Sequence, residues 1–500
     1  MKGYILYFVL FIYILLDLGV EGADNGLTLF VNPTAKTPNQ DCGATIDLAC
    51  KTIGQAINSY DISNKGDNSI PLLIQLMDGV YGSETNAVVI DSKSGVESVS
   101  LQSWSNNSAN VVLYGSTLFF SYTNSSNTVN QQTISFSNVT LNSTLLISSL
   151  DSSCVSVTFS DCVFENINTA PPVVNLSYQS GGASQPSFII KNSMINTFAN
   201  RECPAFQVNN YAILLDTVSF NNNSVQTMFT LSNSEIQITS MTMNSVNASL
   251  SPFTINNSNV SVSDSTFNLN KGALVGVFDI QSNNTTKSTM NRCTFYKNQG
   301  YSGAGSISLK NSLTPVFLNC NFTGNVAIGN GGAININNAN DVNIGNTLFS
   351  TNVATQLGGA LYLSSGQGSV SGSQFLDNSS FRGGGIGVLN STLQLTSDTF
   401  NQNYGAINGQ NIDCTLSSLD ISASTLNTLF KYQGIFCPAG DCKVSGIESN
   451  STCPSNSSSS SSHSNNDNKN HDNGLSTRDK IIIGATSPPS PSPSQQLPSQ

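Results

Sequence analysis

Residues 322–361 read FTGNVAIGNGGAININNANDVNIGNTLFSTNVATQLGGAL, and a phenylalanine followed three residues later by an asparagine occurs in them twice. The pair recurs on both sides of this stretch, and between Phe267 and Asn403 it occurs six times: Phe267/Asn270, Phe295/Asn298, Phe322/Asn325, Phe349/Asn352, Phe375/Asn378 and Phe400/Asn403. Successive phenylalanines are 28, 27, 27, 26 and 25 residues apart. A period of this length is typical of a repeat protein in which each unit forms one coil.

A glycine motif accompanies the aromatic one. Gly331-Gly332 and Gly358-Gly359 begin nine residues after Phe322 and Phe349, and Gly383, followed by Gly384 and Gly385, comes eight residues after Phe375. Apolar residues then alternate with other residues, as at Ile334/Ile336 and Leu361/Leu363. Alternation with a period of two indicates β-strands rather than helices.

These patterns together predict a parallel β-helix, in which each short strand pairs with its counterpart one coil away. The phenylalanines are expected to point inward and to stack. The glycines suit corners that need a positive φ or a close approach of the backbone. Asparagine tolerates the left-handed region, and its side-chain amide can bond the asparagine of the next coil.

The repeats resemble those of the polymorphic outer-membrane protein family, within the wider pectin-lyase-like right-handed parallel β-helix superfamily. The resemblance rests on the Phe-x-x-Asn and Gly-Gly-Ala-Ile motifs between Gly303 and Asn403. Residues 50–57 and 74–81 also resemble the helix-then-strand opening of that superfamily. The resemblance implies a right-handed β-helix that acts by adhesion more than by hydrolysis.

The expected fold class is therefore all-β, a right-handed parallel β-helix with a short amino-terminal cap and a disordered Ser/Asn/Pro-rich tail. The expected organisation is a signal peptide (1–22), the cap (23–62), the β-helix (63–410, with its strongest repeats at 267–403), terminal coils with a cysteine-containing cap (411–453) and the tail (454–500). Lys2, the apolar run at 4–16 and the small residues Val20 and Gly22 indicate the signal peptide. No apolar run after the signal peptide is long enough to predict a membrane span or anchor in the sequence as written.

Composition narrows the function classes. Charged residues make up 9% of the chain and the net charge is -11, with no basic cluster, which argues against nucleic acid and anionic membranes as partners. A secreted, extracellular or cell-surface glycoprotein is expected. Candidate N-glycosylation sites in Asn-x-Ser/Thr motifs include Asn106, Asn142, Asn175, Asn321 and Asn390.

The eleven cysteines favour disulfides in a secreted chain. Cys42 and Cys50 are expected to staple the amino-terminal cap, and the carboxy-terminal cap draws on Cys414, Cys437, Cys442 and Cys453. Cys162, Cys293 and Cys320 each stand two residues before a phenylalanine, and buried free thiols are favoured there over a bridge. No spacing typical of a zinc site is present, so no metal is expected.

Enzymes of the superfamily need convergent charged groups, and we find none in the sequence. A polygalacturonase-like site needs paired aspartates, Gly-His-Gly and Arg-x-Lys, but both histidines lie in the tail, at His463 and His471. A lyase-like site needs Ca²⁺-binding carboxylates with a basic residue. The aspartates of the regular coils stand at non-equivalent positions, which favours turn roles: Asp264, Asp341, Asp377 and Asp398.

We therefore expect no catalytic residue, no cofactor and no metal ligand. The function expected is non-catalytic adhesion, matrix or recognition activity, with an extracellular polysaccharide or a surface protein as partner. Two alternatives stay open: a polysaccharide lyase or hydrolase with an unrecognised site, and the ectodomain of a receptor whose anchor is missing from this sequence.

Overall fold

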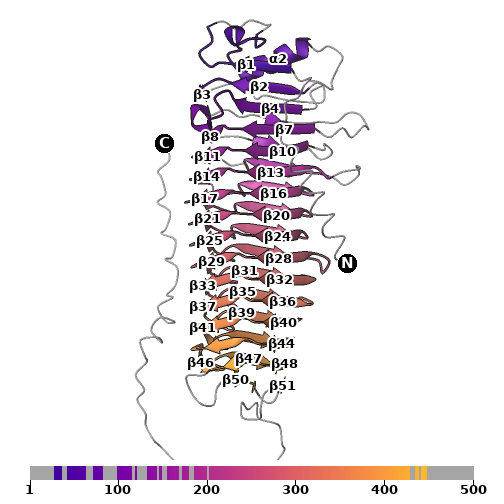
Figure 1. Ribbon diagram of the computed structural model, residues 1–500, viewed down its shortest axis with the longest axis vertical. Coiled ribbons are helices and arrows are strands. Elements are labelled where there is room, and N and C mark those ends of the chain that lie inside the picture. Colours follow the sequence, from indigo (N-terminus) through magenta and orange to yellow (C-terminus); the bar gives the residue numbers. More distant parts are fainter. Residues whose placement is uncertain are drawn as a thin grey trace, which may run out of the picture.

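The computed structural model describes residues 27–36, 42–63, 71–82, 98–114, 119–120, 132–142, 146–148, 155–167, 172–178, 185–199, 202–427, 434–438 and 441–446. They form an elongated stack of coils, with one short strand per sheet in each coil (Figure 1). The predicted all-β, right-handed parallel β-helix is confirmed. The expected signal peptide, the expected tail and Cys453 lie outside the described residues.

Three long parallel sheets and a shorter fourth one form this stack, and we call them A to D. Sheet A consists of β1 (Leu27–Val31), β2 (Leu72–Leu76), β4 (Ser98–Ser103), β7 (Gln132–Ser137), β10 (Val155–Ser160), β13 (Ser187–Lys191), β16 (Ala212–Asp216), β20 (Glu235–Thr239), β24 (Asn259–Ser263), β28 (Lys287–Asn291), β32 (Thr314–Leu318), β36 (Val342–Gly345), β40 (Gln367–Ser371), β44 (Thr392–Thr396), β48 (Ser417–Ser422) and β51 (Cys442–Ser445). Sheet B consists of β3 (Gly79–Gly82), β5 (Val111–Tyr114), β8 (Thr140–Asn142), β11 (Val163–Glu165), β14 (Met194–Asn196), β17 (Ser219–Asn221), β21 (Thr242–Asn244), β25 (Thr266–Asn268), β29 (Thr294–Tyr296), β33 (Asn321–Thr323), β37 (Leu348–Ser350), β41 (Gln374–Leu376), β45 (Thr399–Asn401) and β49 (Thr425–Leu426).

Sheet C consists of β6 (Phe119–Phe120), β9 (Leu146–Ser148), β12 (Val174–Ser177), β15 (Phe206–Asn209), β19 (Phe229–Ser232), β23 (Phe253–Asn256), β27 (Phe278–Gln281), β31 (Ile307–Lys310), β35 (Ile334–Asn337), β39 (Leu361–Ser364), β43 (Ile386–Leu389), β47 (Ile412–Thr415) and β50 (Ile435–Phe436). The short sheet D consists of β18 (Ser224–Val225), β22 (Asn247–Ala248), β26 (Lys271–Gly272), β30 (Gln299–Gly300), β34 (Val326–Ala327), β38 (Val353–Ala354), β42 (Ser379–Arg382) and β46 (Tyr404–Asn408). From β18 onward a coil therefore runs through sheets A, B, D and C in that order.

The inward face of sheet B carries a column of phenylalanine rings. Phe267, Phe295, Phe322, Phe349, Phe375 and Phe400 pair in register on successive strands, and each is fully buried. Neighbouring ring centroids are 4.6–5.2 Å apart, with interplanar angles of 2–12°. Side chains repeat with the coil, so an identical residue at each turn produces this continuous stack.

A second ring column, on sheet C, was not anticipated from the sequence. Phe206, Phe229, Phe253 and Phe278 stack with centroids 4.7–5.0 Å apart. Phe278 ends this column and contacts Phe267 edge-on at 5.0 Å. The aromatic core thus passes from sheet C to sheet B at this coil.

The asparagines of the repeat form a buried ladder at the corner between sheets B and D. Each side-chain Nδ2 donates to Oδ1 of the next member over 2.9–3.1 Å, in the order Asn270, Asn298, Asn325, Asn352, Asn378 and Asn403. Each Oδ1 beyond the first also accepts the backbone N–H of the preceding asparagine. Buried amides need such partners, because an unpaired one costs about 1–3 kcal/mol.

The glycine motif forms the connection from sheet D to sheet C. Gly331, Gly358 and Gly383 have φ of 69°, 65° and 66°, in the left-handed region that favours glycine. At the following position the backbones of neighbouring coils touch. A Cβ on Gly332 would lie 1.9 Å from the Gly359 carbonyl oxygen, and one on Gly359 would lie 2.1 Å from that of Gly384.

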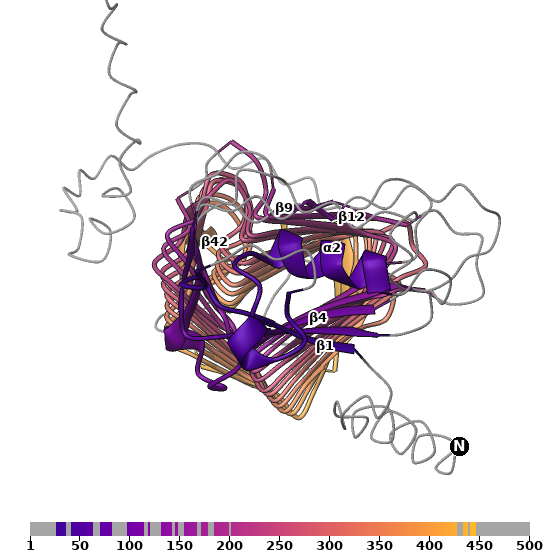
Figure 2. The ribbon, with the colours of Figure 1, turned by 90° about the horizontal axis from the view of Figure 1, so that it is seen from above.

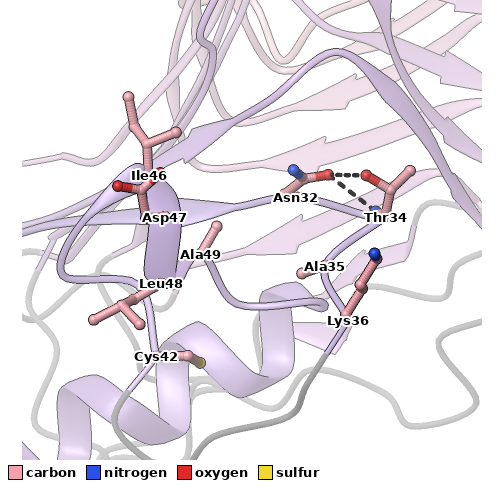
Figure 3. Close-up of a pocket in the computed structure, with 9 residues that line it drawn as sticks. All are labelled: Asn32, Thr34, Ala35, Lys36, Cys42, Ile46, Asp47, Leu48 and Ala49. Carbon is pink, nitrogen blue, oxygen red and sulfur yellow. Dashed lines mark hydrogen bonds between the residues drawn. The ribbon is translucent and has the colours of Figure 1, made fainter.

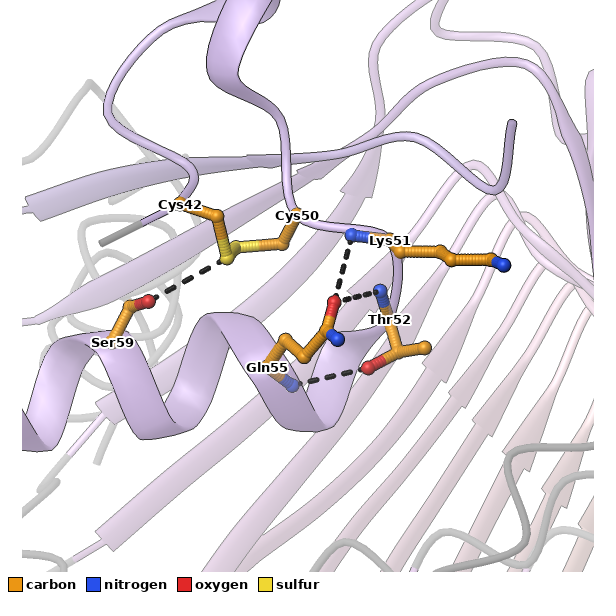
Figure 4. Close-up of a disulfide and its surroundings, with 6 residues drawn as sticks. All are labelled: Cys42, Cys50, Lys51, Thr52, Gln55 and Ser59. Atoms are coloured by element: carbon orange, nitrogen blue, oxygen red, sulfur yellow. Dashed lines mark hydrogen bonds between the residues drawn. A yellow bond between two sulfur atoms is a disulfide. The ribbon is translucent and has the colours of Figure 1, made fainter. Parts of the chain in front are cut away.

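The amino-terminal end is covered by helix α2 (Ile53–Ser63), which lies over the first strands (Figure 2). Thr52 Oγ1 accepts the Gln55 N–H, and Gln55 Oε1 accepts the Thr52 N–H, which is a capping box that starts the helix (Figure 4). Two short 3₁₀ helices, η1 (Ile46–Leu48) and η2 (Ser108–Asn110), also lie in the described part of the chain. Sheet A already begins inside the segment expected to be a cap (23–62), because β1 pairs with β2.

Candidate functional site

A groove of about 820 Å³ runs along the corner between sheets C and A, near the carboxyl end of the stack. It crosses the coils of five successive sheet A strands, from β36 to β51. Twelve residues line it: Asn340, Ser365, Gly366, Gln367, Asn390, Ser391, Thr392, Leu416, Ser417, Ser418, Asp441 and Lys443. It is larger than the cavity at the amino-terminal end, which is described below.

The wall on the sheet A side consists of residues at or near the start of successive strands, which are aligned in register. Gln367 pairs with Thr392, Thr392 with Ser418, and Ser418 with Lys443. These are outward positions, since the alternate residues Leu393 and Leu419 are buried in the core. One polar side chain is therefore presented at each coil.

The floor is a chain of serines at the corner itself. The Gly366 N–H donates to Ser391 Oγ at 3.0 Å, and the Ser391 N–H donates to Ser417 Oγ at 3.0 Å. Each hydroxyl in turn donates to a backbone carbonyl two residues earlier, that of Leu389 or Thr415. The floor is thus held rigidly by its own hydrogen bonds.

The other wall consists of residues in the left-handed conformation. Ser365, Asn390 and Leu416 have φ of 53°, 47° and 50°, which turns each coil sharply into sheet A. Leu416 is the unusual member, because bulky side chains rarely adopt this conformation. It is 59% exposed, so burial does not explain its presence.

The carboxyl end of the groove is fixed by a disulfide. Cys414 of β47 bonds Cys442 of β51, and Cys442 stands between the lining residues Asp441 and Lys443. The Cys437 sulfur lies within 4.8 Å of both bridged sulfurs. Because two of these three sulfurs are bonded to each other, the group offers no set of thiolates for a metal ion.

The amino-terminal cysteines are also joined, as Cys42–Cys50, with Cys42 beside Ser59 of α2 (Figure 4). The second cavity, of about 310 Å³, lies at this end (Figure 3). Its polar groups bond one another, since the Thr34 N–H and hydroxyl both donate to Asn32 Oδ1. Cys162, Cys293 and Cys320 are free buried thiols, and burial raises the pKa of Cys162 to about 12.

The aspartates expected in turns differ in their surroundings. Asp264 is exposed and forms a bidentate pair with Arg292, whose hydrogen bonds lower the pKa of that carboxyl. Asp341 Oδ1 accepts from Gln367 Nε2 at 3.3 Å. Asp398 is 1% exposed and accepts the backbone N–H groups of Ser373 and Thr396, while burial raises its pKa to about 6.

Sequence reasoning missed two further buried carboxyls, both on the outward side of sheet C. Burial raises the pKa of Asp413, against the opposing effect of Arg382, whose Nε lies 3.3 Å from Asp413 Oδ2. Burial likewise raises the pKa of Asp279, opposed by Lys310. Asp279 and Asp413 stand five coils apart in one register column, so they cannot act on one bond.

The candidate glycosylation sites occupy different environments. Asn106 and Asn390 are exposed at turns with positive φ. Asn142, Asn175 and Asn321 are half-buried on strands. The structure does not gather the predicted repeat residues into the groove, since the phenylalanines and asparagines lie in the core.

No protein-family model matches the chain, and no curated protein matches it. Among solved structures it is similar to tailspike protein 3 of bacteriophage CBA120, with 12% identity and a TM-score of 0.36 over 84% of this chain and 60% of the tailspike. It is also similar to the A-module of mannuronan C-5 epimerase AlgE6 from Azotobacter vinelandii, with 11% identity and a TM-score of 0.26 over 80% of this chain and 100% of the module. A third is a mannuronic acid specific polysaccharide family 6 lyase from human gut microbiota, with 9% identity and a TM-score of 0.32 over 78% of this chain and 82% of the lyase.

The chain therefore spans 60% of the length of the tailspike that it matches. At such low identity, what these proteins do is not transferred to this chain. What the fold and the groove define is a class: a parallel β-helix protein with a polar groove along one corner. Within the described residues, no helix has the length and apolar character that crossing a membrane requires.

Proposed function

We propose that this protein is a secreted or cell-surface β-helix that binds an extended polysaccharide along the corner groove without cleaving it. The observation that carries the proposal is the composition of the lining, in which eight of the twelve residues bear hydroxyl or carboxamide side chains and two bear charge. Sugar hydroxyls pair with hydroxyl and amide groups as both donors and acceptors. The groove crosses five coils, a length of about 19 Å at the strand spacing, which accommodates several sugar units.

Leu416 supports the same ligand class. A sugar ring has an apolar face beside its hydroxyls, and an exposed aliphatic side chain between polar neighbours fits that face. The left-handed conformation of Leu416 costs free energy that asparagine or glycine would avoid.

Two features favour an extracellular location. Two disulfides, Cys42–Cys50 and Cys414–Cys442, suit an oxidising compartment. The amino-terminal residues expected to form a signal peptide point the same way. The resemblance of the repeats to the polymorphic outer-membrane family supports adhesion as the biological role.

The charge distribution favours binding over turnover. Glycoside hydrolysis requires two carboxyl groups that flank one bond, about 5–10 Å apart. Of the residues lining the groove, Asp441 alone bears a carboxyl. The buried Asp398 bonds backbone amides at the corner between sheets A and B, and Asp413 pairs with Arg382.

The test combines a glycan array with a turnover assay on the whole protein, secreted from a host that lacks N-glycosylation as well as from one that glycosylates. We expect binding to a polysaccharide, with neither new reducing ends nor unsaturated products when Ca²⁺ is supplied. Gln367→Ala, in the groove, should weaken binding about tenfold through the loss of one or two hydrogen bonds. Gln394→Ala is the matched control, because Gln394 is exposed two residues along β44 from Thr392, outside the groove.

If the two variants bind the polysaccharide with equal affinity, the groove is not the binding site. Turnover abolished by Asp413→Asn would instead support the polysaccharide lyase or hydrolase alternative. Absence of any glycan binding would leave a surface protein as the partner and contradict the ligand class proposed here.

A further inference from the structure

One of the sequence's glycosylation motifs lies inside the groove. Asn390, Ser391 and Thr392 form an Asn-x-Thr motif, and all three residues line the groove. They belong to the coil of β44, the middle one of the five coils that the groove crosses. A group attached here would therefore stand halfway along the groove.

The side chain of Asn390 is available for attachment. Asn390 is exposed, and its side chain makes no hydrogen bond in the described part of the chain. Its backbone N–H donates to the Thr415 carbonyl, so the corner is held without the side-chain amide. Earlier members of the same corner column differ, because Asn338 Nδ2 donates to Asn311 Oδ1 at 2.7 Å.

Other glycosylation motifs in the sequence have different surroundings in the structure. Asn378, followed by Ser379 and Ser380, also matches Asn-x-Ser, but its Nδ2 is buried and donates to Asn403 and to the Phe349 carbonyl. A glycan there would break the asparagine ladder. Asn321 is half-buried on sheet B, away from the groove, and accepts the Thr323 hydroxyl at 2.6 Å.

We infer that Asn390 is an N-glycosylation site whose glycan covers the corner groove, so that its occupancy decides whether the groove admits a polysaccharide. This inference rests on the proposed function of the groove. Glycosylated protein has the groove closed, and protein unmodified at Asn390 has it open.

The modification itself is a group transfer. The Nδ2 of Asn390 displaces the polyprenyl diphosphate from C1 of a lipid-linked oligosaccharide, which breaks the C1–O bond to phosphate and forms an N-glycosidic bond. The amide loses one proton, and the lipid diphosphate is the leaving group. The folded corner tolerates the product, because the side chain already projects into solvent.

The experiment compares wild type, Asn390→Gln and Asn321→Gln, each secreted from a glycosylating host and from the periplasm of a bacterium that lacks N-glycosylation. Glycopeptide mass spectrometry measures occupancy at Asn390. Affinity for the array-selected polysaccharide should rise about tenfold or more when the glycan is absent, in wild type and in Asn390→Gln alike. Asn321→Gln removes a glycosylation motif outside the groove and should behave as wild type.

A second measurement does not need the polysaccharide. Hydroxyl-radical footprinting reports the exposure of Leu416, which is 59% exposed in the groove, and of Leu269, which is 49% exposed outside it. A glycan at Asn390 should protect Leu416 and leave Leu269 unchanged. If Asn390 is unmodified in the glycosylating host, or if its glycan protects nothing, the inference is wrong. If protection occurs but no form binds polysaccharide, the proposed function fails while the modification site stands.

Discussion

Asp398 stands in a corner column between sheets A and B whose neighbouring members are Ser373 and Ser424. The Ser373 N–H donates to Asp398 Oδ1 at 2.7 Å, and the Asp398 N–H donates to Ser424 Oγ at 3.0 Å. A serine in place of Asp398 would accept the hydrogen bond from the Ser373 N–H through its hydroxyl and would carry no charge. The carboxyl is thus an ionisable group in a place that a neutral residue could fill, and burial raises its pKa to about 6.

Stability should therefore depend on pH through Asp398. The unfolded carboxyl ionises near 3.8 and the folded one near 6, so the folded state binds the proton more tightly between these values. Its contribution to stability is present below about pH 4 and is lost as the pH rises through 6, by up to about 3 kcal/mol. Asp398→Ser should remove this loss. Denaturant midpoints from pH 3.5 to 7 measure it, and parallel profiles of the two proteins would refute the role.

Leu416 gives a second prediction at this scale, with Leu269 as its matched control. Both leucines are exposed and have positive φ, 50° and 55°, but only Leu416 lies in the groove. Leu416→Asn and Leu269→Asn should each raise stability by about 0.5–1 kcal/mol, because asparagine tolerates this conformation better. Only Leu416→Asn should weaken polysaccharide binding.

Glycosylation of the introduced asparagine has to be prevented in this comparison. Leu416→Asn creates an Asn-Ser-Ser motif with Ser417 and Ser418, so both variants are made in a host that does not glycosylate. Thermal melts and titrations with the array-selected glycan measure the two effects. Equal loss of binding in both variants would show that Leu416 has no special contact.

The core residues of the regular repeat could be predicted from the sequence, whereas those of the groove could not. Phe349 and Asn352 are recognisable because one residue type recurs at a fixed spacing. Corner positions accept several residue types, so the column of Ser365, Asn390 and Leu416 has no sequence signature. Asp398 was expected at a turn, but its burial depends on the neighbouring coils and could not be read from the sequence.

At the scale of elements, the sheet B ring stack is a test of the core. Phe349 is fully buried between Phe322 and Phe375, at centroid distances of 5.2 and 4.8 Å. Phe349→Ala should lower the free energy of unfolding by about 3–5 kcal/mol. Phe381→Ala is the control, since Phe381 is 46% exposed on β42 and should change little. Urea unfolding measures both, and an unchanged midpoint for Phe349→Ala would contradict the role of the stack.

The Cys414–Cys442 bridge is the corresponding test for the groove's carboxyl end. The bridge closes a loop of 28 residues and ties β51 to the stack. Replacing both cysteines with serine should destabilise the terminal coils by about 2–4 kcal/mol and weaken ligand binding with them. Amide hydrogen exchange should rise in residues 441–446 while β28–β32 stay protected. Protection that remains unchanged in 441–446 would show that strand pairing alone holds this end.

The elements that could be predicted from the sequence are those in the most regular coils. Sheet B was anticipated from the spacing of its phenylalanines. The sheet C stack was not, because only Phe206 and Phe253 of its four phenylalanines have an asparagine three residues later, and three of the four precede the regular repeat that begins at Phe267. The groove requires side chains from five coils to be placed side by side, and serine, threonine and asparagine are too common here for their alignment to be visible.

At the scale of the whole molecule, stability is expected to be a sum of coil and interface terms, because each strand pairs only with the coils before and after it. The ring stacks and the asparagine ladder add the same kind of coupling between neighbours. A substitution in one coil should therefore act locally. Substitutions in the groove should therefore leave the amino-terminal cap unchanged, so that the binding affinities of the groove variants can be compared directly.

Because the coils stack in register, the position of the groove along the axis can change independently of the residues that line it. The groove occupies the coils of β36 to β51, and the coils before them set its distance from the amino-terminal end of the stack. Gaining or losing one whole coil upstream would keep every ring and amide in phase and would move the groove by about 4.8 Å along the axis. Evolution could thus adjust how far the proposed binding surface stands from the amino-terminal end of the stack, without altering a residue that lines the groove.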